Sequence, residues 1–217
     1  MKNSFFHALG PTRRRFALLA AAAATLPLLT TARAAAPRST DVRNRFPSLA
    51  FTMTRSSDGQ VVTASDFRGR VVILYFGFTR CPDTCPLTMQ NAARVLQRMG
   101  PLAGQMRVVF VTVDLANDTL PRLKAYLANF GKPPEIDGLR GTPEQLAVLA
   151  KRYGVTYTAP SSPDAPDPVS QISHTAAVYV FDAEGHARQI FGTLALGSAD
   201  IPGIAADLEP LAREARH

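Results

Sequence analysis

Two unbroken apolar runs in the middle of the chain predict buried strands. Val71 to Phe76 (VVILYF) and Arg107 to Asp114 (RVVFVTVD) are rich in β-branched and aromatic residues. Strands that are buried on both faces show such continuous runs, whereas strands with one face in water alternate apolar and polar residues. We therefore expect these two runs to lie at the centre of a sheet that is at least partly parallel.

Helical segments follow and separate these runs. Helix-starting and helix-stopping residues predict helices over 86–99, 120–130, 141–151 and 200–215. Pro86 suits the first position of a helix, because its missing N–H would have no partner there. Thr142 is the expected N-cap of the third helix, since its hydroxyl can accept a hydrogen bond from a free backbone N–H.

Turn signals predict two hairpins and one long loop. Residues 49–54 and 60–63 flank the turn sequence Ser-Asp-Gly, and residues 175–181 and 186–191 flank Asp-Ala-Glu-Gly. Both patterns are typical of antiparallel strand pairs joined by short turns. Residues 159–170 contain four prolines in twelve positions and are expected to form a loop.

The order of these elements predicts the fold class. A parallel βαβ core, followed by an antiparallel hairpin and a closing helix, is the thioredoxin-like α/β arrangement. We expect a central mixed sheet flanked by helices, with an N-terminal β-hairpin, over residues 46–217. Residues 37–45 are polar and are expected to be a flexible tether.

The first 36 residues resemble an export signal. Arg13-Arg14-Arg15 precedes an uncharged run rich in Ala and Leu, and Ala32-Arg33-Ala34 offers a small-residue cleavage site. The paired arginines favour the twin-arginine route. We expect export to the periplasm, either with cleavage of the leader or with the leader retained as an inner-membrane anchor. If the leader is cleaved, any contact with the membrane would come through a partner.

The formal net charge of +7 belongs mostly to this leader. The rest of the chain has 19 basic and 17 acidic residues, a net charge of +2. No basic stripe interleaved with aromatic residues remains there, so nucleic-acid binding is not expected.

The only two cysteines, Cys81 and Cys85, lie between the first buried run and the helix that follows it. A helix N-terminus favours a thiolate over a thiol, which suits both a nucleophile and a metal ligand. A purely structural disulfide is a weak explanation, because so small a loop contributes only about 2 kcal/mol of stability. In an oxidising compartment, free thiols persist when a metal or a reductant protects them.

His174 is the best third partner for these thiols. Of the four histidines, it alone is expected to enter a core strand at the end that faces the cysteine loop. The competing interpretation is an ordinary histidine at a strand edge. Two thiolates and an imidazole form a soft ligand set that suits Cu(I) and can also hold Cu(II), whereas structural zinc usually needs a fourth ligand.

Four sequence blocks resemble the Sco (SenC) family. They are GFTRCPDTCPLTM, VTVDLANDTLPRLKAYLANF, IDGLRGTPEQLAVLAKRYGV and ISHTAAVYVFDAEG, and the resemblance extends from about Phe46 to Leu211. The first block is the most specific, because the cysteine pair, its prolines and the preceding Gly-Phe-Thr match together.

The resemblance implies a thioredoxin-like copper-binding protein that assists cytochrome c oxidase assembly. The family's copper ligands match Cys81, Cys85 and His174. Asp114 and Asp118 match an acidic loop, which either docks a partner, supports the site or is simply a solvated turn. The expected partners are subunit II of the oxidase or another cuproprotein, and a periplasmic copper donor.

The leading functional interpretation is a copper metallochaperone rather than an enzyme. It would deliver copper to the binuclear copper centre of subunit II. A thiol–disulfide reductase that keeps the cysteines of that subunit reduced is the main alternative, and a copper or redox sensor is another. The reductase would use Cys81 and Cys85 and would not need His174.

Overall fold

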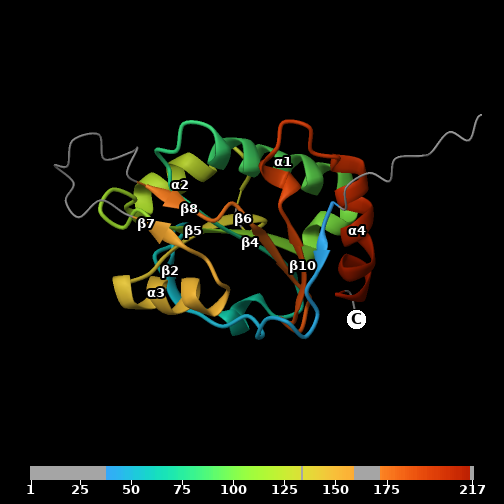
Figure 1. The fold of residues 1–217 in the computed structure, drawn as a ribbon, viewed down its shortest axis with the longest axis horizontal. Coiled ribbons are helices and arrows are strands. Elements are labelled where there is room, and N and C mark those ends of the chain that lie inside the picture. Colours follow the sequence, from blue (N-terminus) through green and yellow to red (C-terminus); the bar gives the residue numbers. More distant parts are fainter. Residues whose placement is uncertain (1–37, 133, 159–171, 216–217) are drawn as a thin grey trace, which may run out of the picture. The chain divides into compact units, whose positions relative to one another are not determined.

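A mixed eight-stranded sheet forms the centre of the domain in the computed structural model, which describes residues 38–132, 134–158 and 172–215 (Figure 1). The strand order is β1-β10-β9-β4-β5-β6-β2-β3. Helices α1 (Thr84–Met99) and α4 (Ile201–Glu214) pack together on one side of the sheet, and α3 (Pro143–Arg152) lies on the other side. The predicted mixed sheet with flanking helices is confirmed.

Three parallel strands form the middle of the sheet. They are β4 (Val71–Gly77), β5 (Met106–Thr112) and β6 (Ile136–Arg140). Every residue of β4 is buried, as its continuous apolar run predicts. The carboxyl ends of β4 and β5 are adjacent, since Gly77 pairs with Thr112.

The strand β6 is absent from the sequence prediction, because Asp137-Gly138 gives it the composition of a turn. In the structure Asp137 is buried and accepts hydrogen bonds from the hydroxyls of Ser56 and Ser57. A Cβ at Gly138 would lie 2.9 Å from Leu127 Cδ1, so glycine allows the helix that precedes this strand to pack closely. Tertiary contacts therefore override the local preference.

Antiparallel strands complete both edges of the sheet. The hairpins β2 (Thr52–Arg55)–β3 (Val61–Thr63) and β9 (Val178–Phe181)–β10 (Ala187–Phe191) confirm the two predicted strand pairs.

The prediction of a flexible tether is wrong for the described residues 38–45. There β1 (Thr40–Asp41) pairs with β10, and Val42 is buried in the core.

The helix boundaries differ from their predictions by a few residues. Helix α1 begins at Thr84, so Pro86 occupies its third position rather than its first. This is tolerated because the first four N–H groups of a helix have no partner within the helix. Helix α2 (Leu120–Leu127) ends before the predicted Phe130, and Thr142 caps α3 as expected.

His174 lies in a separate two-stranded ribbon rather than in a core strand. β7 (Tyr157–Thr158) pairs with β8 (Ser173–His174), and the core strand β9 begins only at Val178. The expected entry of His174 into the core strand is therefore wrong. The predicted proline-rich loop lies outside the described residues.

Short 3₁₀ helices connect the remaining elements: η1 (Ala64–Phe67), η2 (Gly100–Gln105) and η3 (Thr193–Ala195).

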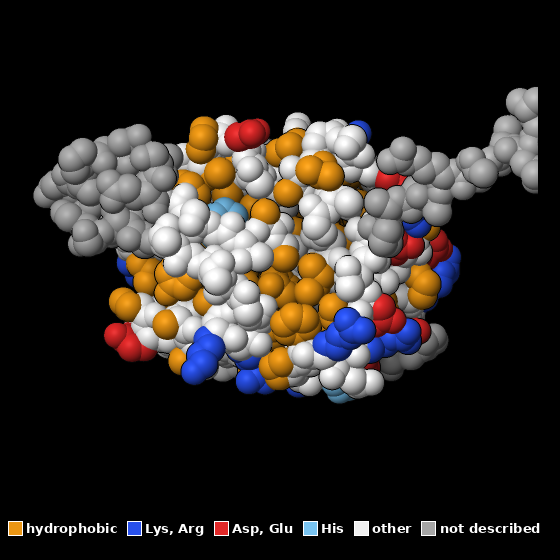
Figure 2. Space-filling model, viewed as in Figure 1, with side chains coloured by type: hydrophobic (Ala, Val, Ile, Leu, Met, Phe, Trp, Pro, Cys, Tyr) orange, Lys and Arg blue, Asp and Glu red, His pale blue; other side chains and the backbone are white. Residues whose placement is uncertain are grey.

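The predicted leader lies outside the described residues. Within the part of the chain that the structure describes, no helix has the length and apolar character needed to cross a bilayer. On the face shown in Figure 2, basic side chains are interspersed with acidic ones along the lower edge, while hydrophobic side chains lie across the middle.

Gly77 is a test of the close packing beneath the cysteines. A Cβ there would lie 2.7 Å from Phe110 Cε2 and 3.1 Å from Cys85 Sγ. Gly77→Ala is expected to lower the free energy of unfolding by about 1–3 kcal/mol, as overpacking of a rigid core does. Urea unfolding would measure the change. Gly197→Ala is the control, since no heavy atom lies within 4 Å of its added Cβ; equal stability of both variants would contradict the tight fit.

Candidate metal and thiol site

The two cysteines lie at the carboxyl end of β4, where a strand gives way to a helix. Cys85 is the second residue of α1 and is completely buried, whereas Cys81 is partly exposed in the preceding loop. Neither cysteine forms a disulfide in the structure. In open α/β sheets, binding sites form beyond the carboxyl ends of the strands, as they do here.

The sulfur of Cys81 acts as a cap for α1. Asp83 occupies the N-cap position but makes no capping hydrogen bond with its side chain. Instead, the backbone N–H of Cys85 donates to Cys81 Sγ at 3.4 Å. A thiolate suits this place because the N-terminus of a helix carries a partial positive charge.

Hydrogen bonding makes Cys81 the more acidic thiol. The Cys85 side chain is the main cause of a Cys81 pKa of about 3, and the backbone N–H groups of Cys85 and Asp83 lower it further, against the opposing effect of burial. The same contact with Cys81, together with burial, raises the pKa of Cys85. The pair therefore shares one proton: Cys81 is a partly exposed thiolate and Cys85 is a buried thiol.

The ring nitrogen Nε2 of His174 faces the buried thiol. It lies 3.3 Å from Cys85 Sγ, while Nδ1 lies 3.2 Å from the carbonyl oxygen of Thr175. A carbonyl only accepts hydrogen bonds, so Nδ1 carries the proton and Nε2 presents a lone pair to the sulfur. This is the tautomer that a metal ligand needs.

Aromatic side chains hold this arrangement from the sheet side. The ring of His174 makes edge contacts with Tyr75 and Phe78, with centroid separations of 5.7 and 5.9 Å. The hydroxyl of Tyr75 donates to Cys85 Sγ at 3.5 Å. The structure thus brings together the three predicted ligands; their role in binding metal stays a prediction.

Asp118 ties the cysteine loop to the loop that follows β5. Its carboxylate is buried and accepts hydrogen bonds from the backbone N–H of Thr79 at 3.0 Å and from Thr112 Oγ1 at 2.6 Å. The hydroxyl of Thr79 donates to its other oxygen at 2.5 Å. Burial is the main cause that raises the pKa of Asp118, and these hydroxyls act against it. Thr79 lies two residues before Cys81, so this carboxylate positions the loop that carries the thiolate.

Asp114 makes a second tie between the same two loops. It is buried and forms an ion pair with Arg80 at 2.9 Å, and it accepts a hydrogen bond from Asn117 at 2.9 Å. Arg140 of β6 fixes the acidic loop from the other side, by donating to the carbonyl oxygens of Leu115 and Asp118 at 2.8 and 3.0 Å.

The carboxylates of Asp114 and Asp118 both point into the protein and are fully buried, so neither of them is a solvated group of a turn. Their expected roles in docking a partner or supporting the site stay predictions. Sequence reasoning missed their partners Thr79 and Arg80, and it also missed Tyr75. The available signal was that Thr79 and Arg80 belong to the cysteine block itself, and that a tyrosine interrupts the buried strand.

The turn between β9 and β10 also gathers side chains that could bind a metal. Among the described residues, Asp182, Glu184 and His186 bring potential ligand atoms within 4.8 Å of one another. Asp182, however, already pairs with Arg188 at 3.1 Å and accepts the backbone N–H of His186 at 2.7 Å, which explains the cluster as a stabilised turn.

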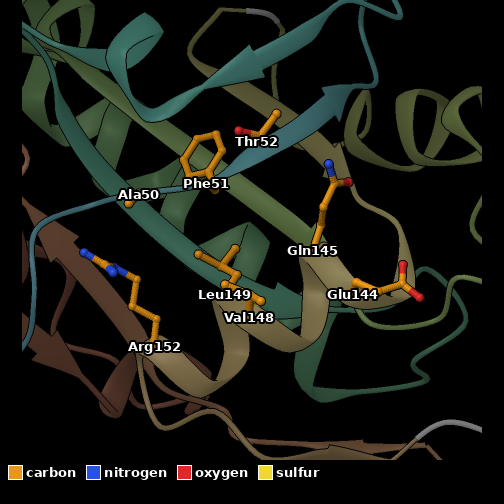
Figure 3. Close-up of a pocket in the computed structure, with 8 residues that line it drawn as sticks. All are labelled: Ala50, Phe51, Thr52, Glu144, Gln145, Val148, Leu149 and Arg152. Carbon is orange, nitrogen blue, oxygen red and sulfur yellow. The ribbon is translucent and has the colours of Figure 1, made fainter.

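A groove of about 460 Å³ lies between the start of β2 and α3 (Figure 3). Apolar side chains lie in its middle, and charged side chains lie at its two ends. Its lining residues are Ala50, Phe51, Thr52, Glu144, Gln145, Val148, Leu149 and Arg152. It contains neither a thiol nor an imidazole, so the cysteine site remains the chemical centre of the described chain.

Comparison with known proteins identifies the family. The SCO1/SenC family model matches residues 44–210. The chain belongs to the SCO1/SenC family. Protein sco1 of Schizosaccharomyces pombe is 32% identical over 135 residues, which are 62% of this chain and 51% of that protein. The chain thus spans about half the length of the curated Sco relatives it matches.

Solved Sco structures share the fold. Bradyrhizobium japonicum ScoI with copper bound is 30% identical, with a TM-score of 0.65 over 76% of this chain and 98% of that chain. Yeast Sco1 with copper bound is 28% identical, with a TM-score of 0.64 over 79% of this chain and 96% of that chain. The thioredoxin-like fold class and the family resemblance are confirmed.

The acidity of Cys81 is testable by alkylation of the reduced, metal-free protein. Because its pKa is about 3, Cys81 should react with iodoacetamide nearly as fast at pH 5 as at pH 7. A cysteine with an ordinary pKa loses about 100-fold in rate over this range. Peptide mass spectrometry would follow both cysteines, and buried Cys85 should stay unmodified. A hundredfold fall at Cys81 would show that it is an ordinary thiol.

The role of Asp118 is testable with Asp118→Asn. The amide nitrogen of asparagine cannot accept a hydrogen bond, so at least one buried donor of Thr79 or Thr112 loses its partner. The free energy of unfolding should fall by about 1–3 kcal/mol. Hydrogen exchange at the Thr79 amide should also become faster.

The matched control is Asp58→Asn, which removes an exposed pair with Arg55. Its expected cost is below about 1 kcal/mol. If Asp118→Asn is no more costly than this control and leaves Thr79 protected, the carboxylate does not hold the loop.

Proposed function

We propose that this Sco protein binds one copper ion through Cys81, Cys85 and His174 and passes it to another cuproprotein. The observation that carries the proposal is the convergence of a thiolate, a second sulfur and an imidazole lone pair at one end of β4. The copper-bound structures of ScoI and yeast Sco1 support it. A soft set of two sulfurs and one nitrogen suits Cu(I) and can also hold Cu(II).

Membership of the Sco family supports a role in cytochrome c oxidase assembly. We propose subunit II of the oxidase, with its binuclear copper centre, as the acceptor. The export signal predicted for residues 1–36 supports a periplasmic location, with or without a retained anchor.

The geometry suits a metal that must leave again. Copper would take the place of the proton on Cys85, and metal binding to thiols generally releases protons in this way. Cys85 is buried, whereas Cys81 and His174 are both partly exposed. A ligand of the acceptor can therefore approach on the side of Cys81 and His174, and copper can move by stepwise exchange of ligands.

The asymmetry of the thiols favours a second candidate function, thiol–disulfide reduction. The Cys81 thiolate would attack a disulfide of the partner, form a mixed disulfide and release one partner thiolate. Cys85 would lose its proton and attack the Cys81 sulfur, which releases the second partner thiolate and leaves a Cys81–Cys85 disulfide. Two electrons thus pass from this protein to the partner, with Cys81 as the nucleophile and Cys85 as the resolving cysteine.

Copper loading of the reduced protein separates the two functions. The wild type should bind one copper per chain and show thiolate-to-Cu(II) charge-transfer absorption after loading with Cu(II). His174→Ala and Cys81→Ser should each weaken copper binding by more than the roughly 10–100-fold that loss of a ligand's outer hydrogen-bond partner costs, because each removes one of only three ligands. His186→Ala, an exposed histidine in a surface turn, is the control and should bind as the wild type does.

Reduction of a model disulfide by the same variants completes the test. His174→Ala should retain this activity if reduction is the function, since thiol exchange does not use the imidazole as a ligand. A wild type that binds no copper tightly but forms a reducible Cys81–Cys85 disulfide would overturn the metallochaperone proposal in favour of the reductase.

A further inference from the structure

Tyr75 is the residue through which the central sheet donates a hydrogen bond to the buried sulfur. It lies two residues before the end of β4, where it pairs with Phe110 of β5 and with Val178 of β9, and only 1% of its surface is exposed. Its ring packs on Phe110 with a centroid separation of 5.9 Å. Strands on both sides and a packed ring therefore fix the position of the Tyr75 hydroxyl.

The side chain of Tyr75 contacts two of the three candidate ligands. Its hydroxyl donates to Cys85 Sγ at 3.5 Å, and its ring meets the ring of His174 edge to face at a centroid separation of 5.7 Å. These two ligands also contact each other, since His174 Nε2 lies 3.3 Å from Cys85 Sγ. Tyr75, Cys85 and His174 thus form a closed triangle, one corner of which belongs to the central sheet.

The three candidate ligands come from elements outside that sheet. His174 belongs to a two-residue strand of a separate ribbon, and Cys81 lies in the loop between β4 and α1. Cys85 is the second residue of α1, and its side chain has the Cys81 sulfur on one side and the imidazole of His174 on the other. A hydrogen bond from a fixed donor contributes enough free energy to favour one side-chain rotamer over another.

We propose that Tyr75 is a positioning residue, whose hydroxyl directs the Cys85 sulfur toward His174 and so favours copper binding over formation of the Cys81–Cys85 disulfide. A disulfide requires the two sulfurs to approach to about 2.05 Å, which turns Cys85 Sγ toward Cys81 and away from Tyr75. A thiolate bound to copper is a charged acceptor, which strengthens a hydrogen bond, whereas a disulfide sulfur is neutral. The inference rests on the proposed function in taking Cys85 and His174 as copper ligands.

Tyr75→Phe tests the hydroxyl alone, because phenylalanine keeps the ring that packs on Phe110 and His174. The matched control is Tyr179→Phe, which removes a buried hydroxyl that donates to the carbonyl oxygen of Tyr153 at 2.9 Å. Tyr179 pairs with Leu74, so it lies on the opposite face of the sheet from Tyr75. Both variants lose one buried hydrogen bond, and an effect of stability alone should therefore appear in both.

The first measurement is the equilibrium of the metal-free thiol pair with glutathione at a fixed pH. The S–S bond of the pair forms as that of oxidised glutathione breaks. Two electrons leave the pair, and the two reduced glutathione molecules take up the proton of the pair and one proton from solvent. Alkylation followed by mass spectrometry gives the oxidised fraction.

The equilibrium constant should shift about fivefold toward the disulfide in Tyr75→Phe, which is the usual size of one hydrogen bond. In Tyr179→Phe it should stay within about twofold of the wild type, because that hydrogen bond is the same in both redox states.

The second measurement is the Cu(I) affinity of the reduced protein, by competition with the chelator bicinchoninate. Tyr75→Phe should bind Cu(I) about tenfold more weakly, since loss of a hydrogen-bond partner that orients a metal ligand has an effect of this size. Tyr179→Phe should bind Cu(I) as the wild type does.

An unchanged glutathione equilibrium in Tyr75→Phe would overturn the inference, as would an unchanged Cu(I) affinity beside a wild type that binds copper, or the same shifts in Tyr179→Phe. A wild type that binds no Cu(I) tightly would overturn the metallochaperone proposal and the preference for copper. A fivefold shift of the glutathione equilibrium would even then support Tyr75 as the residue that directs the Cys85 sulfur.

Discussion

The parallel pairing of β4 with β5 is the constraint on which the site depends. It brings the carboxyl ends of two strands side by side, and the backbone N–H of Val113 extends the pairing by donating to the carbonyl oxygen of Gly77 at 2.9 Å. The loop that carries Cys81 and the acidic loop therefore leave the sheet as neighbours. Buried carboxylates can then join them, because each finds its donors within a short distance. Without this pairing, Asp118 would be an unpaired buried charge.

The two sulfurs differ because they lie at different depths in the same helix terminus. Cys81 accepts the backbone N–H of Cys85 in the first turn of α1 and is partly exposed to solvent, whereas Cys85 is buried in contact with the hydroxyl of Tyr75. This difference serves metal transfer and thiol exchange equally well, since both need one accessible sulfur and one protected sulfur. His174 is the residue that separates the two chemistries, because only metal binding requires its lone pair.

Much of this arrangement could be predicted from the sequence, since the buried runs, the turn signals and the cysteine block are local patterns. The three candidate ligands could be named because their residue types are rare in the chain. Three features could not be predicted, because they depend on partners distant in the sequence. The strand β6 is stabilised by Ser56 and Ser57, the segment before Val42 pairs with a strand near the other end of the chain, and the exposure of Asp118 is decided by the fold around it.

The capping of α1 by a sulfur links the chemistry of the site to the order of a helix. As a thiolate, Cys81 supplies an anion to the first turn of α1; in a disulfide the same sulfur is neutral and supplies none. Oxidation therefore removes a stabilising charge from the place where the helix starts. The stability of the first turn of α1 therefore depends on whether the thiol pair is reduced or oxidised. A binding partner that contacts the backbone of this turn can distinguish the two redox states without contacting either sulfur.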